Sequence, residues 1–176
     1  MYFAGHGVQV EGRNYIMTVD SANIASAEDV RRYGIDVGKL MRDVQVAGAA
    51  TSVLFLDACR SNPFADAPWS SGRGSPIAAN EYVSGNGSGQ LASDMFAPVG
   101  AAISFSTQPE ETASDGPSGQ NSPYATSFAE TIGEIPGIKF SELFAQIERR
   151  VLAKTGGVQR PWVSSRIIRD VTLIGR

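Results

Sequence analysis

The chain contains one cysteine and one histidine among 176 residues, and this scarcity excludes several kinds of protein. A single cysteine cannot form an intrachain disulfide, which fits a reducing compartment such as the cytoplasm. A metal site built from cysteine and histidine needs more of both residues, so we expect none. No apolar run approaches the roughly 20 residues of a membrane-spanning helix. The N-terminus also lacks the basic region and long apolar stretch of a secretory signal.

Basic residues are neither abundant nor clustered. The chain carries 15 lysines and arginines against 18 acidic residues, for a net charge of −3. Without a basic stripe, nucleic acid is not an expected partner. The length and the 42% apolar content are sufficient for a packed core. We therefore expect one domain over residues 1–176 that binds neither nucleic acid nor a membrane.

Short apolar runs alternate along the chain with stretches of helical periodicity. The pattern predicts strands over 1–4, 52–56, 101–105 and 171–174, a hairpin over 8–16, and helices over 37–44, 123–132 and 140–151. Ser122 and Pro123 are a typical N-cap and first-turn proline for the second of these helices. Residues 20–35, 61–95 and 107–122 are expected to be irregular, and 61–95 is a long loop. This alternation predicts an α/β fold with a mostly parallel sheet and helices on both faces.

His6 and Cys59 each follow one of the short apolar runs. The carboxyl ends of parallel strands meet at one edge of a sheet, so the imidazole and the thiol are expected to lie in one cleft. An imidazole that removes the thiol proton creates a nucleophile for attack on a carbonyl. The backbone N–H groups of Gly7 and Cys59 are candidates for holding the resulting oxyanion. Taken singly, His6 also fits an ordinary turn histidine, and Cys59 a small buried apolar residue.

Two segments resemble the catalytic segments of caspase-like cysteine peptidases, most closely the bacterial and metacaspase-type branch. They read YFAGHG at residues 2–7 and LFLDACR at residues 54–60, and a Pro-Trp pair at 161–162 resembles the same branch. Cys59 follows His6 by 53 residues, near the caspase spacing of about 50. The resemblance implies a caspase-like three-layer fold and a thiol endopeptidase with a His6–Cys59 dyad. Asp57 and Ser61 depart from the Gln-Ala-Cys-x-Gly caspase signature.

The metacaspase resemblance implies cleavage after arginine or lysine in the substrate. Asp57 matches an acidic pocket residue of that branch, and Asp115 falls where a second acid is expected. Two carboxylates would favour a guanidinium over neutral side chains. Each aspartate also has a structural interpretation, Asp57 as a strand-end cap and Asp115 as a turn residue before glycine. Arg73, within the long loop, is a candidate autoprocessing site.

The resemblance also indicates that the chain departs from the family pattern at its start. Family members begin with two further strands and two helices, so we expect an N-terminally truncated domain whose first strand is an exposed sheet edge. A dimer, or a second chain that supplies strands, could cover it. The alternative function is an inactive caspase-like module that acts as a scaffold or regulator, and a third is a cysteine esterase or amidase. No cofactor is assigned, although some metacaspase relatives depend on calcium.

Overall fold

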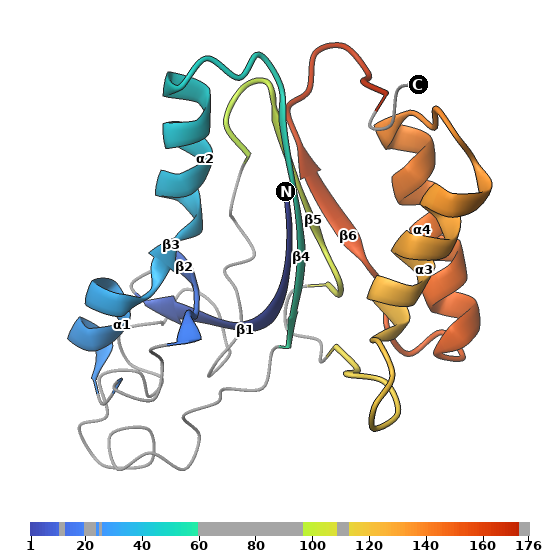
Figure 1. Ribbon diagram of the computed structural model, residues 1–176, viewed down its shortest axis with the longest axis horizontal. Coiled ribbons are helices and arrows are strands. Elements are labelled where there is room, and N and C mark those ends of the chain that lie inside the picture. Colours follow the sequence, from blue (N-terminus) through green and yellow to red (C-terminus); the bar gives the residue numbers. More distant parts are fainter. Residues whose placement is uncertain (11–12, 20–23, 25, 60–96, 109–112, 173–176) are drawn as a thin grey trace.

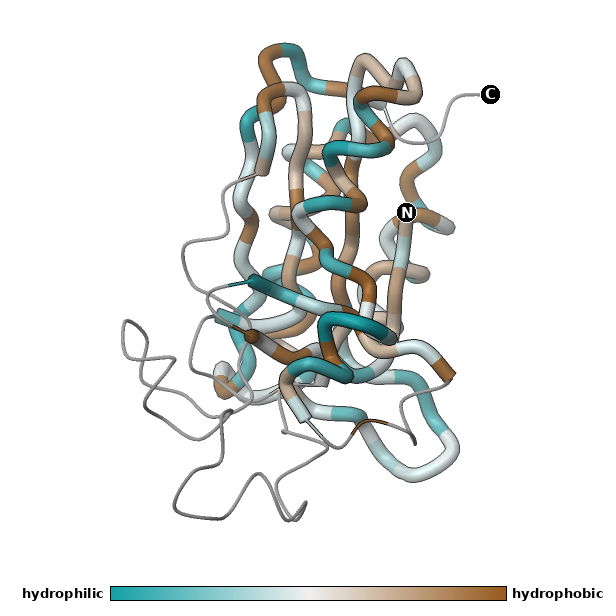
Figure 2. Tube along the Cα trace, turned by 90° about the vertical axis from the view of Figure 1, so that its left-hand side faces the viewer, coloured by the Kyte–Doolittle hydropathy of each residue, from teal (hydrophilic) through white to brown (hydrophobic). Residues whose placement is uncertain are grey.

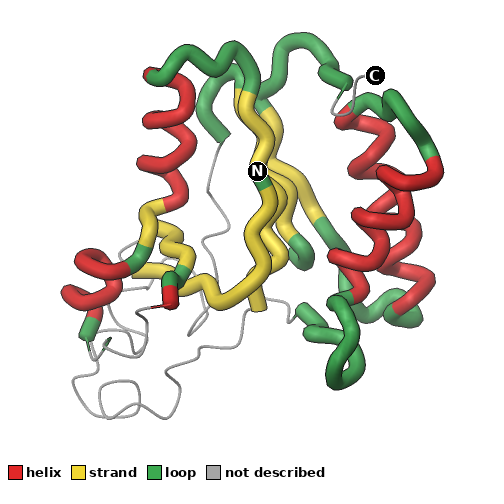
Figure 3. Tube along the Cα trace, viewed as in Figure 1, coloured by secondary structure: helices red, strands yellow, loops and turns green. Residues whose placement is uncertain are grey.

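A six-stranded sheet forms the centre of the molecule (Figures 1 and 3). The computed structural model describes residues 1–10, 13–19, 24, 26–59, 97–108 and 113–172 of the chain. Within them the sheet has the order β3-β2-β1-β4-β5-β6. Its strands are β1 (Tyr2–Val10), β2 (Arg13–Ile16), β3 (Ile35–Asp36), β4 (Ser52–Cys59), β5 (Ala101–Phe105) and β6 (Trp162–Ser165).

The sheet is mixed, which corrects the expectation of a mostly parallel one. β4 runs parallel to both β1 and β5. The β1–β2, β2–β3 and β5–β6 pairs are antiparallel. The predicted hairpin over 8–16 accounts for the first of these, because strands joined by a short turn must run in opposite directions. The parallel part is therefore the three-strand centre, where β1 and β4 carry His6 and Cys59.

Helices cover both faces of the sheet and complete three layers (Figure 1). Helices α1 (Ala27–Tyr33) and α2 (Val37–Val46) lie on one face, and α3 (Pro123–Glu134) and α4 (Phe140–Lys154) lie on the other. Ser122 caps α3 as predicted, since its hydroxyl accepts a hydrogen bond from the Ala125 N–H at 2.9 Å. None of the helices in the described ranges is long and apolar enough to cross a membrane.

The core is divided between the two faces by the alternation of side chains along β4. Leu54 and Leu56 pack toward α2, whereas Val53 and Phe55 pack toward α3 and α4. Helix α2 buries Val37 and Met41 against the first cluster. Figure 2 shows hydrophilic and hydrophobic residues alternating along the helices on this side of the sheet. By the same alternation Asp57, two residues after Phe55, belongs to the α3 face.

The structure differs from the predicted elements in two places. The stretch over 20–35 contains α1, whose start is marked by the Ser26 hydroxyl accepting from the Asp29 N–H at 3.1 Å. A serine three residues before an acidic residue is the signal that was missed. Strand β6 was not predicted. Of the strand predicted over 171–174, residues 173 and 174 lie outside the described residues, and Thr172 forms an isolated bridge with Lys139. The expected loop over 61–95 lies outside the described residues.

Strand β1 has one unpaired edge within the described part of the chain. β2 pairs with Gly7–Val10 only, whereas β4 pairs with Tyr2–His6 on the opposite side. The outer edge of residues 2–5 therefore has no neighbouring strand among the described residues. Met1 and Tyr2 are 50% and 39% exposed there. Exposed apolar residues on an unpaired edge are what the sequence predicted for this strand.

Candidate active site

The register of β1 against β4 brings the two predicted catalytic residues to one place. Tyr2 pairs with Phe55, Ala4 with Asp57 and His6 with Cys59. His6 has an exposed side chain, and Cys59 is the last residue of β4. His6 and Cys59 are therefore neighbours in the sheet, but His6 lies inside β1 and not beyond its end as expected. The meeting of the imidazole and the thiol in one cleft, and their catalytic roles, stay predictions.

Beyond this point β1 turns away to form the hairpin with β2 (Figure 1). Gly5 permits the bend, because its φ of +154° is one that residues with side chains rarely adopt. A Cβ at this position would also lie 2.9 Å from the ring of Phe3. The curvature separates the part of β1 that pairs with β4 from the part that pairs with β2.

The same hairpin determines the direction in which the backbone N–H of Gly7 points. Met17 donates its N–H to the carbonyl of His6 at 2.9 Å, so His6 belongs to the hydrogen-bonded set of this antiparallel pair. In such pairs the next residue directs its N–H away from the partner strand. The Gly7 N–H therefore points away from β2, toward the side on which β4 lies. An amide so directed is suited to bind an oxyanion, which stays a prediction for Gly7 and Cys59.

Asp57 is a buried carboxyl group that accepts hydrogen bonds from two hydroxyl groups of distant residues. It is 7% exposed, and its Oδ2 accepts hydrogen bonds from the hydroxyls of Tyr2, at 2.9 Å, and Ser122. Burial raises the pKa of Asp57 above its ordinary value, and the Ser122, Tyr2 and Ser106 hydroxyls oppose this rise.

Asp115 lies close enough to act on Asp57 electrostatically. Its negative charge adds to the rise in the Asp57 pKa. Asp115 is exposed and precedes Gly116, which has a φ of +80° and donates its N–H to the Ser114 hydroxyl at 3.1 Å. A Cβ on Gly116 would lie 2.5 Å from the carbonyl oxygen of Asn121. The tight turn at Gly116 thus fixes the backbone directly after Asp115.

Sequence reasoning missed the groups that hold these aspartates. Tyr2 occupies the same face as Asp57 because positions 2, 4 and 6 of β1 alternate with positions that point to the other face. That period was visible in the sequence. Ser106 and Ser122 lie 49 and 65 positions from Asp57 along the chain, and no local pattern indicates that either of them acts on it.

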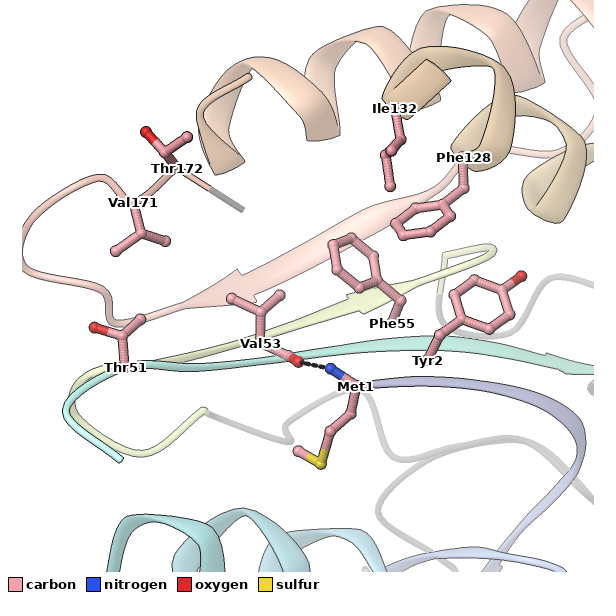
Figure 4. A pocket seen from close by; sticks show the side chains of 9 residues that line it. All are labelled: Met1, Tyr2, Thr51, Val53, Phe55, Phe128, Ile132, Val171 and Thr172. Atoms are coloured by element: carbon pink, nitrogen blue, oxygen red, sulfur yellow. Dashed lines mark hydrogen bonds between the residues drawn. The ribbon is translucent and has the colours of Figure 1, made fainter. Parts of the chain in front are cut away.

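The hollow beside the site is apolar and does not contain the predicted catalytic residues (Figure 4). Its volume is about 440 Å³, and Tyr2 is its one connection to the Asp57 cluster among the lining residues. Phe128 packs between the rings of Tyr2 and Phe55, with centroid distances of 5.1 and 4.6 Å. The hollow is lined by Met1, Tyr2, Thr51, Val53, Phe55, Phe128, Ile132, Val171 and Thr172.

Two further expectations concern residues and ligands away from this cluster. Arg73, the predicted processing site, lies outside the described residues. Within the described residues, no group of three histidine, cysteine, aspartate or glutamate side chains is arranged to hold a metal ion.

The comparison with known families covers almost the whole chain. Residues 1–172 match the family described as the caspase domain. None of the curated proteins matches this chain. The family match includes both segments that carry His6 and Cys59.

Proposed function

This chain belongs to the caspase-domain family of cysteine peptidases, and from this we propose that it is an endopeptidase with a His6–Cys59 dyad. The observation that carries the proposal is the register of the central strands. His6 and Cys59 are the only imidazole and the only thiol of the chain, and they are partners across the β1–β4 pair. An imidazole beside a thiol is the minimum needed for a cysteine nucleophile.

The proposed reaction has two stages. His6 takes the proton of the Cys59 thiol, and the thiolate attacks the carbonyl carbon of the peptide bond. The N–H groups of Gly7 and Cys59 stabilise the oxyanion. The carbon–nitrogen bond then breaks, and His6 returns the proton to the departing amine. In the second stage His6 removes a proton from water, which attacks the thioester and releases the acid and the free thiol.

The acidic pair supports cleavage after arginine or lysine. Asp57 is buried and Asp115 acts on it electrostatically, so a cationic side chain between them would relieve both the desolvation and the repulsion. A guanidinium also forms two parallel hydrogen bonds with a carboxylate. The competing interpretation makes Asp57 a structural group whose hydroxyl partners are its only function.

The test is hydrolysis of matched fluorogenic peptides that end in arginine, lysine or aspartate before the reporter, with and without calcium. The wild type is compared with Cys59→Ala and Asp57→Asn. We expect cleavage after arginine and lysine that is abolished in Cys59→Ala. Cleavage only after aspartate would refute the role of the acidic pair, and cleavage that persists in Cys59→Ala would refute the dyad.

Thiol alkylation distinguishes a peptidase from an inactive scaffold without a substrate. A thiol activated by an imidazole reacts with iodoacetamide well below pH 8. We therefore expect alkylation at pH 6 to 7 in the wild type and a strong loss of rate in His6→Ala. An unreactive thiol in the folded wild type would favour the scaffold.

We propose further that the enzyme cleaves itself after Arg73. Intact mass after incubation is expected to show two fragments for the wild type and an uncut chain for Cys59→Ala and Arg73→Ala. A wild-type chain that stays intact would contradict self-processing and leave the peptidase proposal standing.

A further inference from the structure

Gln159 is a buried amide that joins two segments of the proposed site. It is 1% exposed, yet it lies on the connection between α4 and β6. Its Nε2 donates to the carbonyl of Ser106 at 2.8 Å, and its Oε1 accepts the N–H of Ser114 at 3.0 Å. One group is only an acceptor and the other only a donor, so the bridge needs an amide at this position.

The two segments that Gln159 joins are those that place the two acids. Ser106 follows β5 and donates its N–H at 2.9 Å to the carbonyl of Leu56, the residue directly before Asp57. Ser114 directly precedes Asp115 in the chain. One side chain therefore connects the segment bonded beside Asp57 to the residue that precedes Asp115.

Gln159 is itself fixed to the end of a helix. Its N–H donates to the Thr155 hydroxyl at 3.1 Å, and that hydroxyl donates to the carbonyl of Val151 at 2.8 Å. Thr155 is the C-cap of α4, whose Val151 is fully buried. Through this bridge, the segments that carry the two acids are attached to the packed core.

We propose that Gln159 is a positioning residue that sets the distance between Asp57 and Asp115 and thereby the preference of the enzyme for arginine. The inference rests on the proposed function, because it concerns the binding of a basic side chain at that pair. Gln159 acts through its hydrogen bonds to Ser106 and Ser114. If the bridge is lost, the segment at Asp115 moves relative to Asp57, and a guanidinium can no longer engage both carboxylates.

The experiment compares a peptide that ends in arginine with one that ends in citrulline, its uncharged isostere. The ratio of the two kcat/KM values reports the charged contribution and does not depend on how much of the sample is folded. Wild type is compared with Gln159→Glu, which keeps the shape but opposes a carboxylate to the Ser106 carbonyl, and with Gln159→Ala. Thr155→Val removes the hydroxyl that accepts the N–H of Gln159. Gln146→Glu on α4 is the control for an added negative charge.

We expect the arginine-to-citrulline ratio to fall about tenfold or more in both Gln159 variants, because hydrogen bonds to charged groups are the interactions at stake. The loss should appear in KM for arginine, with citrulline cleavage retained. Thr155→Val should shift the ratio in the same direction, and Gln146→Glu should leave it unchanged.

Three results overturn the inference, and they differ in what they say of the proposed function. An unchanged ratio in both Gln159 variants makes the bridge merely structural and leaves the peptidase and its specificity intact. A wild type that cleaves both peptides equally refutes the acidic pocket, so there is no preference to position. A wild type that cleaves neither refutes the peptidase, and the inference falls with it.

Discussion

Substitution of Ser122 by alanine should destabilise the protein through two separate losses. The Ser122 hydroxyl accepts the Ala125 N–H at the start of α3 and donates to the buried carboxyl group of Asp57. Loss of an N-cap costs about 0.5–2 kcal/mol. Loss of a hydrogen bond to a charged buried group costs about 1.5–3 kcal/mol. The expected sum is about 2–5 kcal/mol, which in a chain of this size lowers Tm by about 4–20 °C.

The two losses respond differently to pH. The pKa of Asp57 is raised in the folded protein, mainly by burial, so folding favours its protonated form. Asp57 therefore stabilises the fold most below its ordinary pKa of 3.8, and this contribution is lost as pH rises through the raised folded-state pKa. The donated hydrogen bond matters most when Asp57 is ionised. The Tm difference between wild type and Ser122→Ala should thus shrink, but not vanish, as pH is lowered from 8 toward 4.

Two more variants at the same position separate the cap from the donor. Ser122→Asp keeps a good N-cap but places a second carboxylate against Asp57, so its deficit should be large at pH 7 and small near pH 4. Ser122→Thr keeps both functions and should unfold within a few degrees of the wild type. Ser118→Ala, an exposed serine of the same segment, is the control for a harmless change. A Ser122→Ala deficit that is the same at every pH would refute the coupling to Asp57.

Three other variants test the groups around the acidic pair. Asp57→Asn removes a buried charge, so at pH 7 it should unfold at a higher temperature than the wild type while losing arginine cleavage, and the thermal advantage should disappear toward pH 4. A lower Tm at pH 7 would mean that the hydroxyl donors outweigh burial. Gly116→Ala should lower the free energy of unfolding in urea by about 1–3 kcal/mol more than Gly119→Ala does. Both glycines have a positive φ, but only Gly116 has a backbone oxygen where the new Cβ would lie, so equal losses would contradict the tight turn. Tyr124→Phe removes a buried hydroxyl that hydrogen-bonds Ser104 at 2.6 Å and should lower the free energy of unfolding by about 1–3 kcal/mol; an unchanged Tm would contradict that bond.

The parts of the fold that the sequence predicted are those with local signals. The strands at 52 and 101 are continuous apolar runs, and the helix after Ser122 has both its cap and its proline. Helix α1 was missed because it has only 7 residues and a weak apolar period, so its cap was the sole signal. The antiparallel β6 was missed because Trp162 and Val163 form a short strand whose pairing with β5 depends on tertiary packing. Trp162 stacks on Phe105 with ring centroids 4.8 Å apart, a contact between residues 57 positions apart.

In the candidate site, too, the residues with a local sequence signal were predicted and the others were not. His6, Cys59 and Asp57 each follow a predicted strand, and the rule that parallel strands deliver their carboxyl ends to one edge predicts that they lie together. In the structure His6 lies inside β1, and the β1–β4 register makes it the partner of Cys59. No comparable rule predicts the positions of Gln159 and Ser106. Their side chains matter because of the loops that they join, and the path of those loops depends on how α4 and β6 pack against the sheet.

The choice of hydrogen-bond donors around Asp57 bears on what this carboxyl group is for. None of the ion pairs in the described residues includes Asp57, and the neutral hydroxyls of Tyr2 and Ser122 donate hydrogen bonds to it. A lysine or arginine partner would stabilise the buried carboxylate more strongly but would also neutralise it. Hydroxyl donors satisfy its oxygens and leave its negative charge uncompensated. The hydroxyl donors stabilise the fold, and the uncompensated charge is the feature that supports the proposed attraction of a cationic side chain to Asp57.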